Sequence, residues 1–355
     1  MESIHGGDIY RNHISMDFSI NVNPLGIPAK VKQALYDAVE RCHEYPDIRS
    51  EQLTDVVSNI LAVPKEYLLF GNGASELFMA IVHALRPVKT MIPVPSFYGY
   101  EYAAESSGSD VVFYPMKEDE QFCLTEDFFE CLTEDVDLLF LANPNNPTGK
   151  LLSKDYLIKL LLLCREKGIY VVLDECFIEF CGSEHSIIAE IKKFDNLLLV
   201  RAFTKIFAIP GVRLGYLVCS NKELLVKVRK QLPEWNLSVF AQTAGIACAK
   251  QLAYGENIAD PINAQSYIEK TIECIQTERM YMTEKLEKLG VCVVPSDTNF
   301  ILIKTELDLY EKLLKQGILI RDCSNFRGLT KGYYRIAIKT REENDRFLEV
   351  LGELE

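Results

Sequence analysis

The chain has 355 residues, of which 48% are hydrophobic and 25% are charged, a composition typical of a globular protein with a large core. This length exceeds that of one typical domain, so we expect two closely packed domains. The net charge of −13 argues against a nucleic-acid partner, because a phosphate backbone requires a basic surface; an anionic substrate would need a locally basic pocket.

The order of apolar and polar residues predicts two kinds of architecture along the chain. Between about residue 50 and residue 245, apolar runs typical of strands alternate with periodic runs typical of helices. This alternation predicts a mostly parallel sheet covered by helices on both faces. Beyond about residue 260, short strands and long helices follow one another, which predicts a separate and smaller α+β domain.

The first candidate site in chain order is a turn of small residues between the apolar run at 67–70 and a helix-like segment that follows it. A strand, a turn and a helix N-terminus together present free backbone N–H groups and the positive end of a dipole, which is what a phosphate dianion requires. Gly73, Ala74 and Ser75 are therefore candidates for a phosphate cup. The alternative is an ordinary strand-to-helix turn, since turns of this composition are common.

Two further candidates follow buried-strand patterns. Residues 143–149 read Asn-Pro-Asn-Asn-Pro-Thr-Gly, and their prolines and glycine would form a turn even without a functional role. Asp174 ends the uniformly apolar run at 169–173. Open α/β sheets place ligand contacts at the C-terminal ends of such strands, although a helix-capping acid is the alternative here.

The fourth candidate segment contains a lysine and an arginine. Lys205 follows Thr204, and Arg213 lies eight residues downstream in a turn that contains proline and glycine. A lysine amine can form a covalent bond with a carbonyl carbon, and a guanidinium group can pair with a phosphate.

Cysteine usage and the N-terminus bear on the compartment. Eleven cysteines are scattered singly without a Cys-x-x-Cys pair, and the first residues have neither the basic nor the apolar part of a signal peptide. No apolar stretch approaches the roughly 18 residues of a membrane span. We therefore expect a cytoplasmic protein without a membrane partner. The five histidines lack metal-ligand spacing, so we expect no metal site.

The four segments occur in the order found in fold-type I enzymes, which use pyridoxal 5'-phosphate (PLP), and the whole chain resembles this family. The resemblance implies an α/β fold of the aspartate aminotransferase type. In such a fold, a large domain holds a mostly parallel sheet between helices and is joined to a smaller α+β domain. It implies an N-terminal arm that begins the small domain at residues 1–44, the large PLP-binding domain at 45–255, and the small C-terminal domain at 256–355.

The resemblance also implies roles at the cofactor. Lys205 and Asp174 would be the catalytic residues: Lys205 would bind the cofactor aldehyde, and Asp174 would pair with the pyridine nitrogen so that the ring can accept electrons. Arg213 would pair with the cofactor phosphate, and Asn146 would donate a hydrogen bond to the phenolic O3'. Where relatives often carry a tyrosine that also bonds O3', this chain has Phe177.

Three more cofactor contacts follow from the same resemblance. Thr204 precedes the lysine, and Phe97 would stack on the cofactor ring, although an aromatic residue in such a loop is more often part of a core. Tyr45 would reach the cofactor phosphate of the neighbouring subunit, which implies a homodimer with a shared active site.

Within the family, the chain resembles histidinol-phosphate aminotransferases and, more closely, the threonine-phosphate decarboxylases of cobalamin biosynthesis. The segments at 5–7, 17–26 and 320–329 point to the decarboxylases, and Leu25 stands where the aminotransferases carry a tyrosine. Arg335 interrupts an apolar strand, where an unpaired charge would be costly, so we expect it to bind a substrate anion. The full set of expected substrate-binding residues is Arg321, Arg335, His5 and Asn23.

These features leave three functions open. The first is decarboxylation of O-phospho-L-threonine, or of a similar phosphorylated amino acid, to an amino alcohol phosphate. The second is amino transfer from histidinol phosphate or a related substrate. The third is a regulatory or assembly protein with a PLP fold and no catalysis, against which the intact Lys205, Asp174, Asn146 and Arg213 argue.

Overall fold

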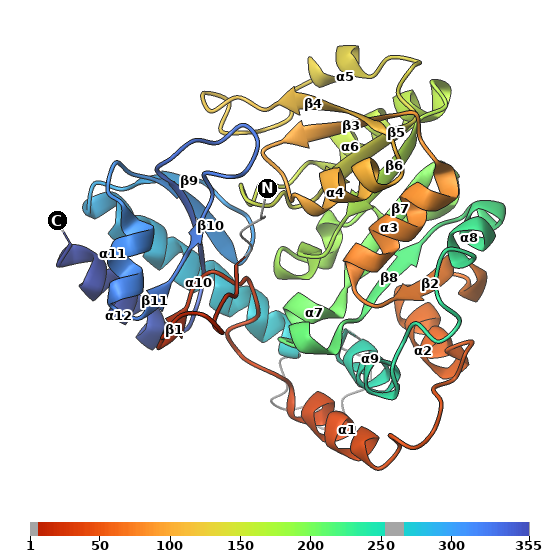
Figure 1. The fold of residues 1–355 in the computed structure, drawn as a ribbon, viewed down its shortest axis with the longest axis horizontal. Coiled ribbons are helices and arrows are strands. Elements are labelled where there is room, and N and C mark those ends of the chain that lie inside the picture. Colours follow the sequence, from red (N-terminus) through yellow and green to blue (C-terminus); the bar gives the residue numbers. More distant parts are fainter. Residues whose placement is uncertain (1–5, 253–265, 355) are drawn as a thin grey trace.

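The computed structural model describes residues 6–252 and 266–354, which fold into two lobes (Figure 1). The larger lobe is built on a seven-stranded sheet with the order β2-β8-β7-β6-β5-β3-β4. Only β8 runs antiparallel to its neighbours in this sheet. The strands are β2 (Leu68–Gly71), β3 (Lys89–Val94), β4 (Asp110–Pro115), β5 (Leu138–Ala142), β6 (Tyr170–Asp174), β7 (Leu197–Ala202) and β8 (Gly215–Val218).

Helices cover both faces of this sheet because the central strands carry apolar side chains on both sides. Along β5, Leu138 and Phe140 pack in one apolar cluster, while Leu139 and Leu141 pack in the other. The first cluster lies under α3 (Ala74–Leu85), α4 (Gly99–Ser106) and α8 (Lys222–Arg229), and the second under α6 (Lys154–Glu166) and α9 (Val239–Leu252). The remaining helices of this lobe are α2 (Glu51–Leu61), α5 (Phe128–Cys131) and α7 (Phe203–Ile206).

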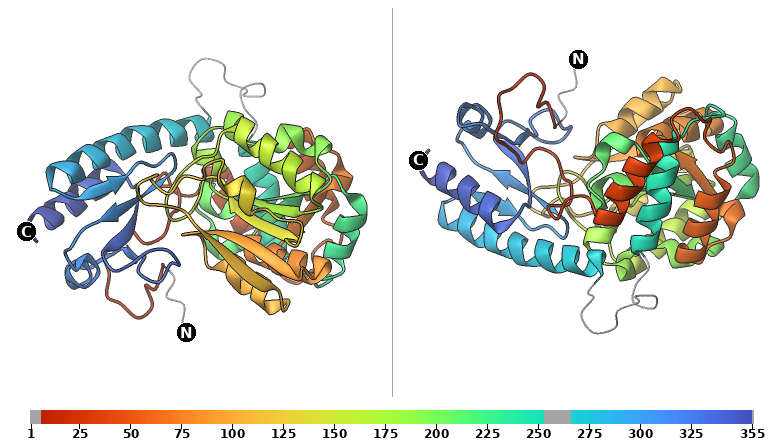
Figure 2. Two further views of the ribbon diagram at one scale, coloured as in Figure 1. Left: turned by 90° about the horizontal axis from the view of Figure 1, so that it is seen from above. Right: turned by 90° about the horizontal axis from the view of Figure 1, so that it is seen from below.

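The smaller lobe contains a four-stranded antiparallel sheet with the order β12-β13-β10-β9. Its strands are β9 (Cys292–Val294), β10 (Phe300–Lys304), β12 (Arg321–Asp322) and β13 (Tyr333–Ala337), and its helices are α10 (Tyr267–Lys288), α11 (Leu309–Lys315) and α12 (Arg341–Gly352). The long helix α10 begins beside the large lobe and runs along the small one (Figure 2). This combination confirms the expected α/β lobe with a smaller α+β lobe.

The N-terminal part of the chain contacts both lobes. Strand β1 (Met16–Asp17) pairs in parallel with β11 (Ile318–Leu319) of the small lobe, whereas α1 (Ala29–Val39) packs on α9 of the large lobe. The domain boundaries expected at residues 44 and 255 stay predictions. In the part of the chain that the structure describes, no helix is both long and apolar enough to cross a membrane.

The topology brings the candidate segments together. Strands β2, β3, β5, β6 and β7 all point the same way, because β2 and β7 are each antiparallel to β8. The segments that contain Gly73, Phe97, Asn146, Asp174 and Lys205 each follow the C-terminal end of one of these strands. They therefore meet at the single edge of the sheet where open α/β folds bind ligands.

Candidate active site

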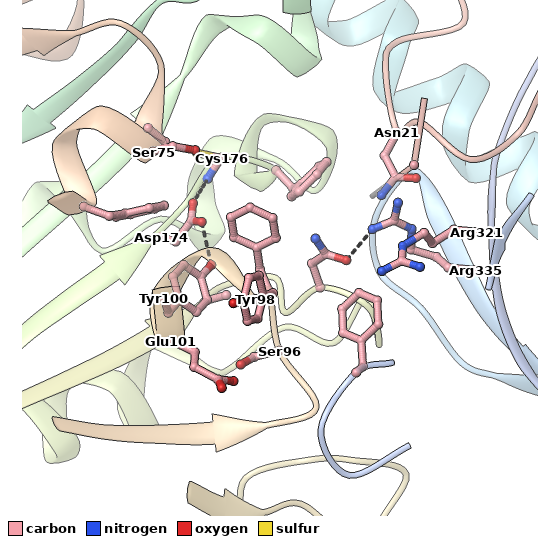
Figure 3. Close-up of a pocket in the computed structure, with 18 of the residues that line it drawn as sticks. Asn21, Ser75, Ser96, Tyr98, Tyr100, Glu101, Asp174, Cys176, Arg321 and Arg335 are labelled. Atoms are coloured by element: carbon pink, nitrogen blue, oxygen red, sulfur yellow. Dashed lines mark hydrogen bonds between the residues drawn. The ribbon is translucent and has the colours of Figure 1, made fainter. Parts of the chain in front are cut away.

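A cavity of about 300 Å³ lies at this edge, between the two lobes (Figure 3). Its walls come from the strand ends of the large lobe, from the N-terminal segment around Asn21, and from β12, β13 and the loop that joins them. Most residues proposed from the sequence line this cavity: Ala74, Ser75, Phe97, Asn146, Asp174, Thr204, Lys205, Arg213, Arg321 and Arg335.

One end of the cavity has the geometry of a phosphate cup. Gly73 has φ 83° and ψ 170°, a conformation open essentially only to glycine, and it immediately precedes the first turn of α3. A Cβ on Gly73 would overlap the guanidinium of Arg213, lying 3.0 Å from its Cζ. Within residues 6–252 and 266–354, no carboxylate lies within 4.0 Å of that guanidinium. The N-terminus of α3 and the guanidinium of Arg213 could therefore bind the same anion.

A second glycine allows the sheet to approach this cup closely. A Cβ on Gly215, the first residue of β8, would lie 2.8 Å from the backbone nitrogen of Ala74. The absence of a side chain here keeps the N–H groups of the first helical turn accessible.

Asp174 is held by two hydrogen bonds at the end of β6. The hydroxyl of Tyr100 donates to its Oδ2 at 2.6 Å, and the backbone N–H of Cys176 donates to its Oδ1 at 2.9 Å (Figure 3). Burial raises the pKa of Asp174, and the hydrogen bonds from Cys176 and Tyr100 oppose this shift. Tyr100 itself stacks on Phe140 with ring centroids 5.2 Å apart, so the carboxylate has a rigid support.

Lys205 lies in α7, the single helical turn that follows β7. Desolvation, followed by the positive charges of Arg335 and Arg213, lowers the pKa of Lys205 to about 8. Near neutral pH, a larger fraction of the molecules therefore carries Lys205 as a neutral amine than would be the case for an ordinary lysine. A neutral amine is the form that attacks a carbonyl carbon.

Two buried arginines face the cavity from the small lobe. Arg321 and Arg335 are register partners on β12 and β13, with relative exposures of 6% and 7%. No carboxylate of the described ranges lies within 4.0 Å of either guanidinium. Like charges placed directly opposite each other on a sheet are destabilising, and buried charges without partners are costly. The two residues together therefore predict an anionic ligand.

Hydrogen bonds fix the position of Arg335. Its Nη1 donates to Oδ1 of Asn146 at 2.5 Å, and its Nη2 donates to the carbonyl of Ser19 at 2.8 Å. When the Asn21 side-chain amide is oriented with its oxygen toward Arg335, this oxygen accepts from Nη1 and Nε at 3.2 Å each. This orientation is the one that pairs donors with acceptors. Burial lowers the pKa of Arg335 to about 10. Asn146 uses its oxygen here, which leaves its N–H groups as the part that could donate to a ligand.

Arg321 is held by its own loop. Its Nη2 donates to Oδ1 of Asn325 at 2.8 Å, its Nη1 donates to the carbonyl of Asp322, and its Cζ lies 4.9 Å from the ring centroid of Phe326. Burial lowers the pKa of Arg321 as well. The guanidinium is thus oriented in the wall of the cavity by neutral groups.

Two further expected site residues, Asn23 and Tyr45, do not line the cavity. The Asn23 side chain donates to the carbonyl of Ile206 at 2.8 Å and to Oγ1 of Thr271 at 2.7 Å, so the structure gives it a structural role beside α7 and not a place in the cavity. Tyr45 is 82% exposed, and its ring packs 5.2 Å from that of Trp235. His5 lies outside the described residues.

Several cavity residues were not found from the sequence. Tyr100 lies one helical turn after Phe97, and the only sequence signal was an aromatic residue at the start of a helix after a strand. Asn21 and Ser19 lie in the 17–26 segment, which the resemblance marked without assigning them roles. The ion pair between Glu101 and Arg327 joins residues 226 positions apart, which no local pattern indicates.

Comparisons with known proteins agree with this geometry. The family model "Aminotransferase class I and II" matches residues 13–351. The chain is 34% identical to threonine-phosphate decarboxylase of Salmonella typhimurium, over 98% of this chain and 96% of that protein. It is 35% identical to the crystal structure of histidinol-phosphate aminotransferase from Clostridium acetobutylicum, with a TM-score of 0.86 and coverage of 95% and 98%.

A third relative is the crystal structure of L-threonine-O-3-phosphate decarboxylase from Porphyromonas gingivalis, 28% identical, with a TM-score of 0.78 and coverage of 95% and 98%. The structural neighbours confirm the expected aspartate aminotransferase-like fold of type I. The chain therefore belongs to the class I and II aminotransferases, a family of PLP-dependent enzymes.

Proposed function

We propose that this protein binds PLP and decarboxylates O-phospho-L-threonine, or a similar phosphorylated amino acid, to an amino alcohol phosphate. The observation that carries the proposal is the pair of buried arginines without carboxylate partners, Arg321 and Arg335, in the cavity that Lys205 also lines. Two anionic groups on a short substrate would compensate both charges. The likeness to a named threonine-phosphate decarboxylase over nearly the whole chain supports this choice.

The residues around the cavity fit PLP. The cup of Gly73, Ala74 and Ser75 with Arg213 suits the cofactor phosphate, and Lys205 supplies an amine of lowered pKa. When bound, PLP supplies an aldehyde for the substrate amine and a ring that withdraws electrons from Cα. Asp174, held by Tyr100, would accept a hydrogen bond from the protonated ring nitrogen, Phe97 would cover the ring, and Asn146 would donate to O3'.

The arginines would divide the two anions of the substrate. We assign the substrate carboxylate to Arg335, because its charge lowers the pKa of Lys205 and because Asn146 and Asn21 fix its orientation. Arg321 would then take the phosphate, and the expected contact of His5 with that phosphate stays a prediction, because His5 lies outside the described residues. By orienting the substrate carboxylate, Arg335 would determine which bond at Cα breaks. Lys205 would supply the proton that Cα takes up after carbon dioxide leaves.

The proposal includes a cytoplasmic homodimer with a shared site. The exposed and neighbouring rings of Tyr45 and Trp235 are the surface that we assign to this subunit contact. In the dimer, Tyr45 would donate to the cofactor phosphate bound by the other subunit.

Amino transfer from histidinol phosphate is the second candidate, and the TM-score of 0.86 to a histidinol-phosphate aminotransferase supports it. The two reactions separate in one experiment. Purified holoenzyme is incubated with O-phospho-L-threonine and, separately, with histidinol phosphate and 2-oxoglutarate. Release of carbon dioxide, without conversion of the cofactor to its amine form, supports the decarboxylase. Rapid conversion to the amine form by histidinol phosphate, with no carbon dioxide from phosphothreonine, would leave the aminotransferase.

A further inference from the structure

One ion pair in the wall of the cavity joins the two lobes. Glu101 lies in α4 of the large lobe, and Arg327 lies in the loop between β12 and β13 of the small lobe. Nε of Arg327 donates to Oε2 of Glu101 at 2.7 Å, and Nη2 donates to Oε1 at 2.6 Å. Both residues line the cavity. Two parallel hydrogen bonds of this kind fix the relative orientation of the partners as well as their distance.

The loop that carries Arg327 is attached on both sides of this residue. Before it, Asn325 accepts from Arg321, and directly after it Gly328 lies beside Pro95, where a Cβ on the glycine would lie 3.5 Å from the proline nitrogen. Between these points the guanidinium of Arg327 lies 4.3 Å from the ring centroid of Phe113, which also lines the cavity. The loop therefore crosses from the anion-binding arginines to the large lobe and forms one side of the cavity.

The charge of Arg327 is already neutralised. Four arginines line the cavity, and among the described residues only Arg327 has a carboxylate within 4.0 Å. Glu101 is buried, while Arg327 is half exposed at the outer side. The pair consequently contributes little net attraction for an anion. Its remaining effect on a ligand is to occupy space.

We propose that Glu101 and Arg327 form a specificity-determining wall that admits only a small second substituent on the substrate Cα. This inference rests on the proposed function. The cavity is at the lower end of the roughly 300–1,000 Å³ common for ligand pockets, and it must hold cofactor and substrate together. O-phospho-L-threonine and histidinol phosphate place amine and phosphate at the same separation, but one carries a carboxylate on Cα and the other a bulky imidazolylmethyl group. The wall excludes the second.

The test compares two ligands that lack the amino group and so bind the holoenzyme without reacting. They are 3-phosphooxybutanoate, which matches phosphothreonine, and 3-(imidazol-4-yl)propyl phosphate, which matches histidinol phosphate. The double variant E101A/R327A removes the wall and keeps the net charge. The control E118A/K304A removes another ion pair between the lobes, at 2.6 Å, whose residues do not line the cavity. Calorimetric titration gives two dissociation constants, one for each ligand, for the wild type and for each variant.

We expect E101A/R327A to bind the imidazole ligand about 10-fold more tightly, in line with the roughly 10- to 200-fold effects of added bulk in enzyme pockets. The dissociation constant of the small ligand should change less than about twofold in this variant. In the control E118A/K304A, the dissociation constants of both ligands should also change less than about twofold. A ratio of the two constants that stays at the wild-type value, or that moves equally in the control, overturns the inference. Glu101→Gln keeps the bulk of the wall but leaves Arg327 with an unpaired positive charge, so a gain for the imidazole ligand over the small ligand there as large as in the double variant also overturns the inference.

Two precautions keep the result decisive. If the double variant does not fold, E101Q/R327A carries the comparison, because it removes the half-exposed arginine and leaves no unpaired carboxylate at the buried position 101. Decarboxylation by the wild-type enzyme is measured separately. Absence of decarboxylation would reject the proposed function. The inference about the wall depends only on how the variants change the ratio of the two dissociation constants.

Discussion

Replacement of Gly73 by alanine tests the phosphate cup most directly. The residue has φ 83° and ψ 170°, and holding alanine there costs on the order of 1–3 kcal/mol. The added methyl group would also overlap the guanidinium of Arg213 and displace it. Loss of one charge-assisted hydrogen bond to the cofactor phosphate is worth about 1.5–3 kcal/mol, or roughly a 10- to 100-fold weaker affinity for PLP.

Two control glycines separate the causes. Gly26 has φ 73° with no atom within 4 Å of an added Cβ, so Gly26→Ala should show backbone strain without a clash. Gly211, in the same turn as Arg213, has an ordinary φ and open space, so Gly211→Ala should change neither stability nor affinity. Urea unfolding of the cofactor-free proteins gives the free energy of unfolding, and titration with PLP gives the affinity.

The expected pattern is loss of stability in the Gly73 and Gly26 variants and loss of PLP affinity in the Gly73 variant alone. A Gly73→Ala protein that binds PLP within about twofold of wild type would refute the cup, because the helix N-terminus and Arg213 could not then be the phosphate site. Equal losses of affinity at Gly26 and Gly73 would point to a general effect on folding.

The remaining predictions concern Lys205 and Asp174. Lys205→Ala should abolish turnover and the visible absorbance of the bound cofactor, and borohydride reduction of the wild type followed by peptide mapping should place the label on Lys205 and on no other lysine. Asp174→Asn should retain PLP but lose several orders of magnitude in kcat, since the ring nitrogen loses its charged partner; activity within a few-fold of wild type would show that Asp174 does not contact the ring. In the cofactor-free protein, the pKa of Lys205 is lowered to about 8 from 10.5, so the folded state binds fewer protons between these values and the free energy of unfolding rises with pH there. Lys205→Met should therefore be more stable than wild type by about 3 kcal/mol below pH 8, with a gap that closes toward pH 10.5, and a gap independent of pH in urea titrations would contradict the shift.

The large-lobe half of the site could be predicted from the sequence because its chemistry follows strand order. Asp174 is the last residue of an apolar strand, and Asn146 and Lys205 lie in the loops or turns that follow two others, and parallel strands bring their C-terminal ends to one edge. Gly73 was found for the same reason, from a turn between a strand and a helix.

The small-lobe half could not be predicted as well. The opposition of Arg321 and Arg335 depends on the antiparallel register of β12 and β13, which joins residues 14 positions apart through a loop that lacks the short hairpin turn from which a register could be predicted. The expectation that Asn23 binds substrate comes with its place in the 17–26 segment. Its side-chain N–H groups instead donate to the carbonyl of Ile206 and to the hydroxyl of Thr271. A motif indicates that a segment is near the site, but only the backbone path decides which side chains point into it.

The two opposed arginines connect the stability of the fold to the choice of reaction. After burial, the positive charge of Arg321 helps to lower the pKa of Arg335, so the two opposed guanidinium groups repel each other in the cofactor-free fold. A substrate with one anion relieves part of this repulsion, and a substrate with two anions relieves nearly all of it. Histidinol phosphate brings only a phosphate, whereas phosphothreonine brings a phosphate and a carboxylate. The arrangement of Arg321 and Arg335 therefore favours the doubly anionic substrate through the free energy released on binding, and binding it places a carboxylate, the group that decarboxylation removes, beside Lys205.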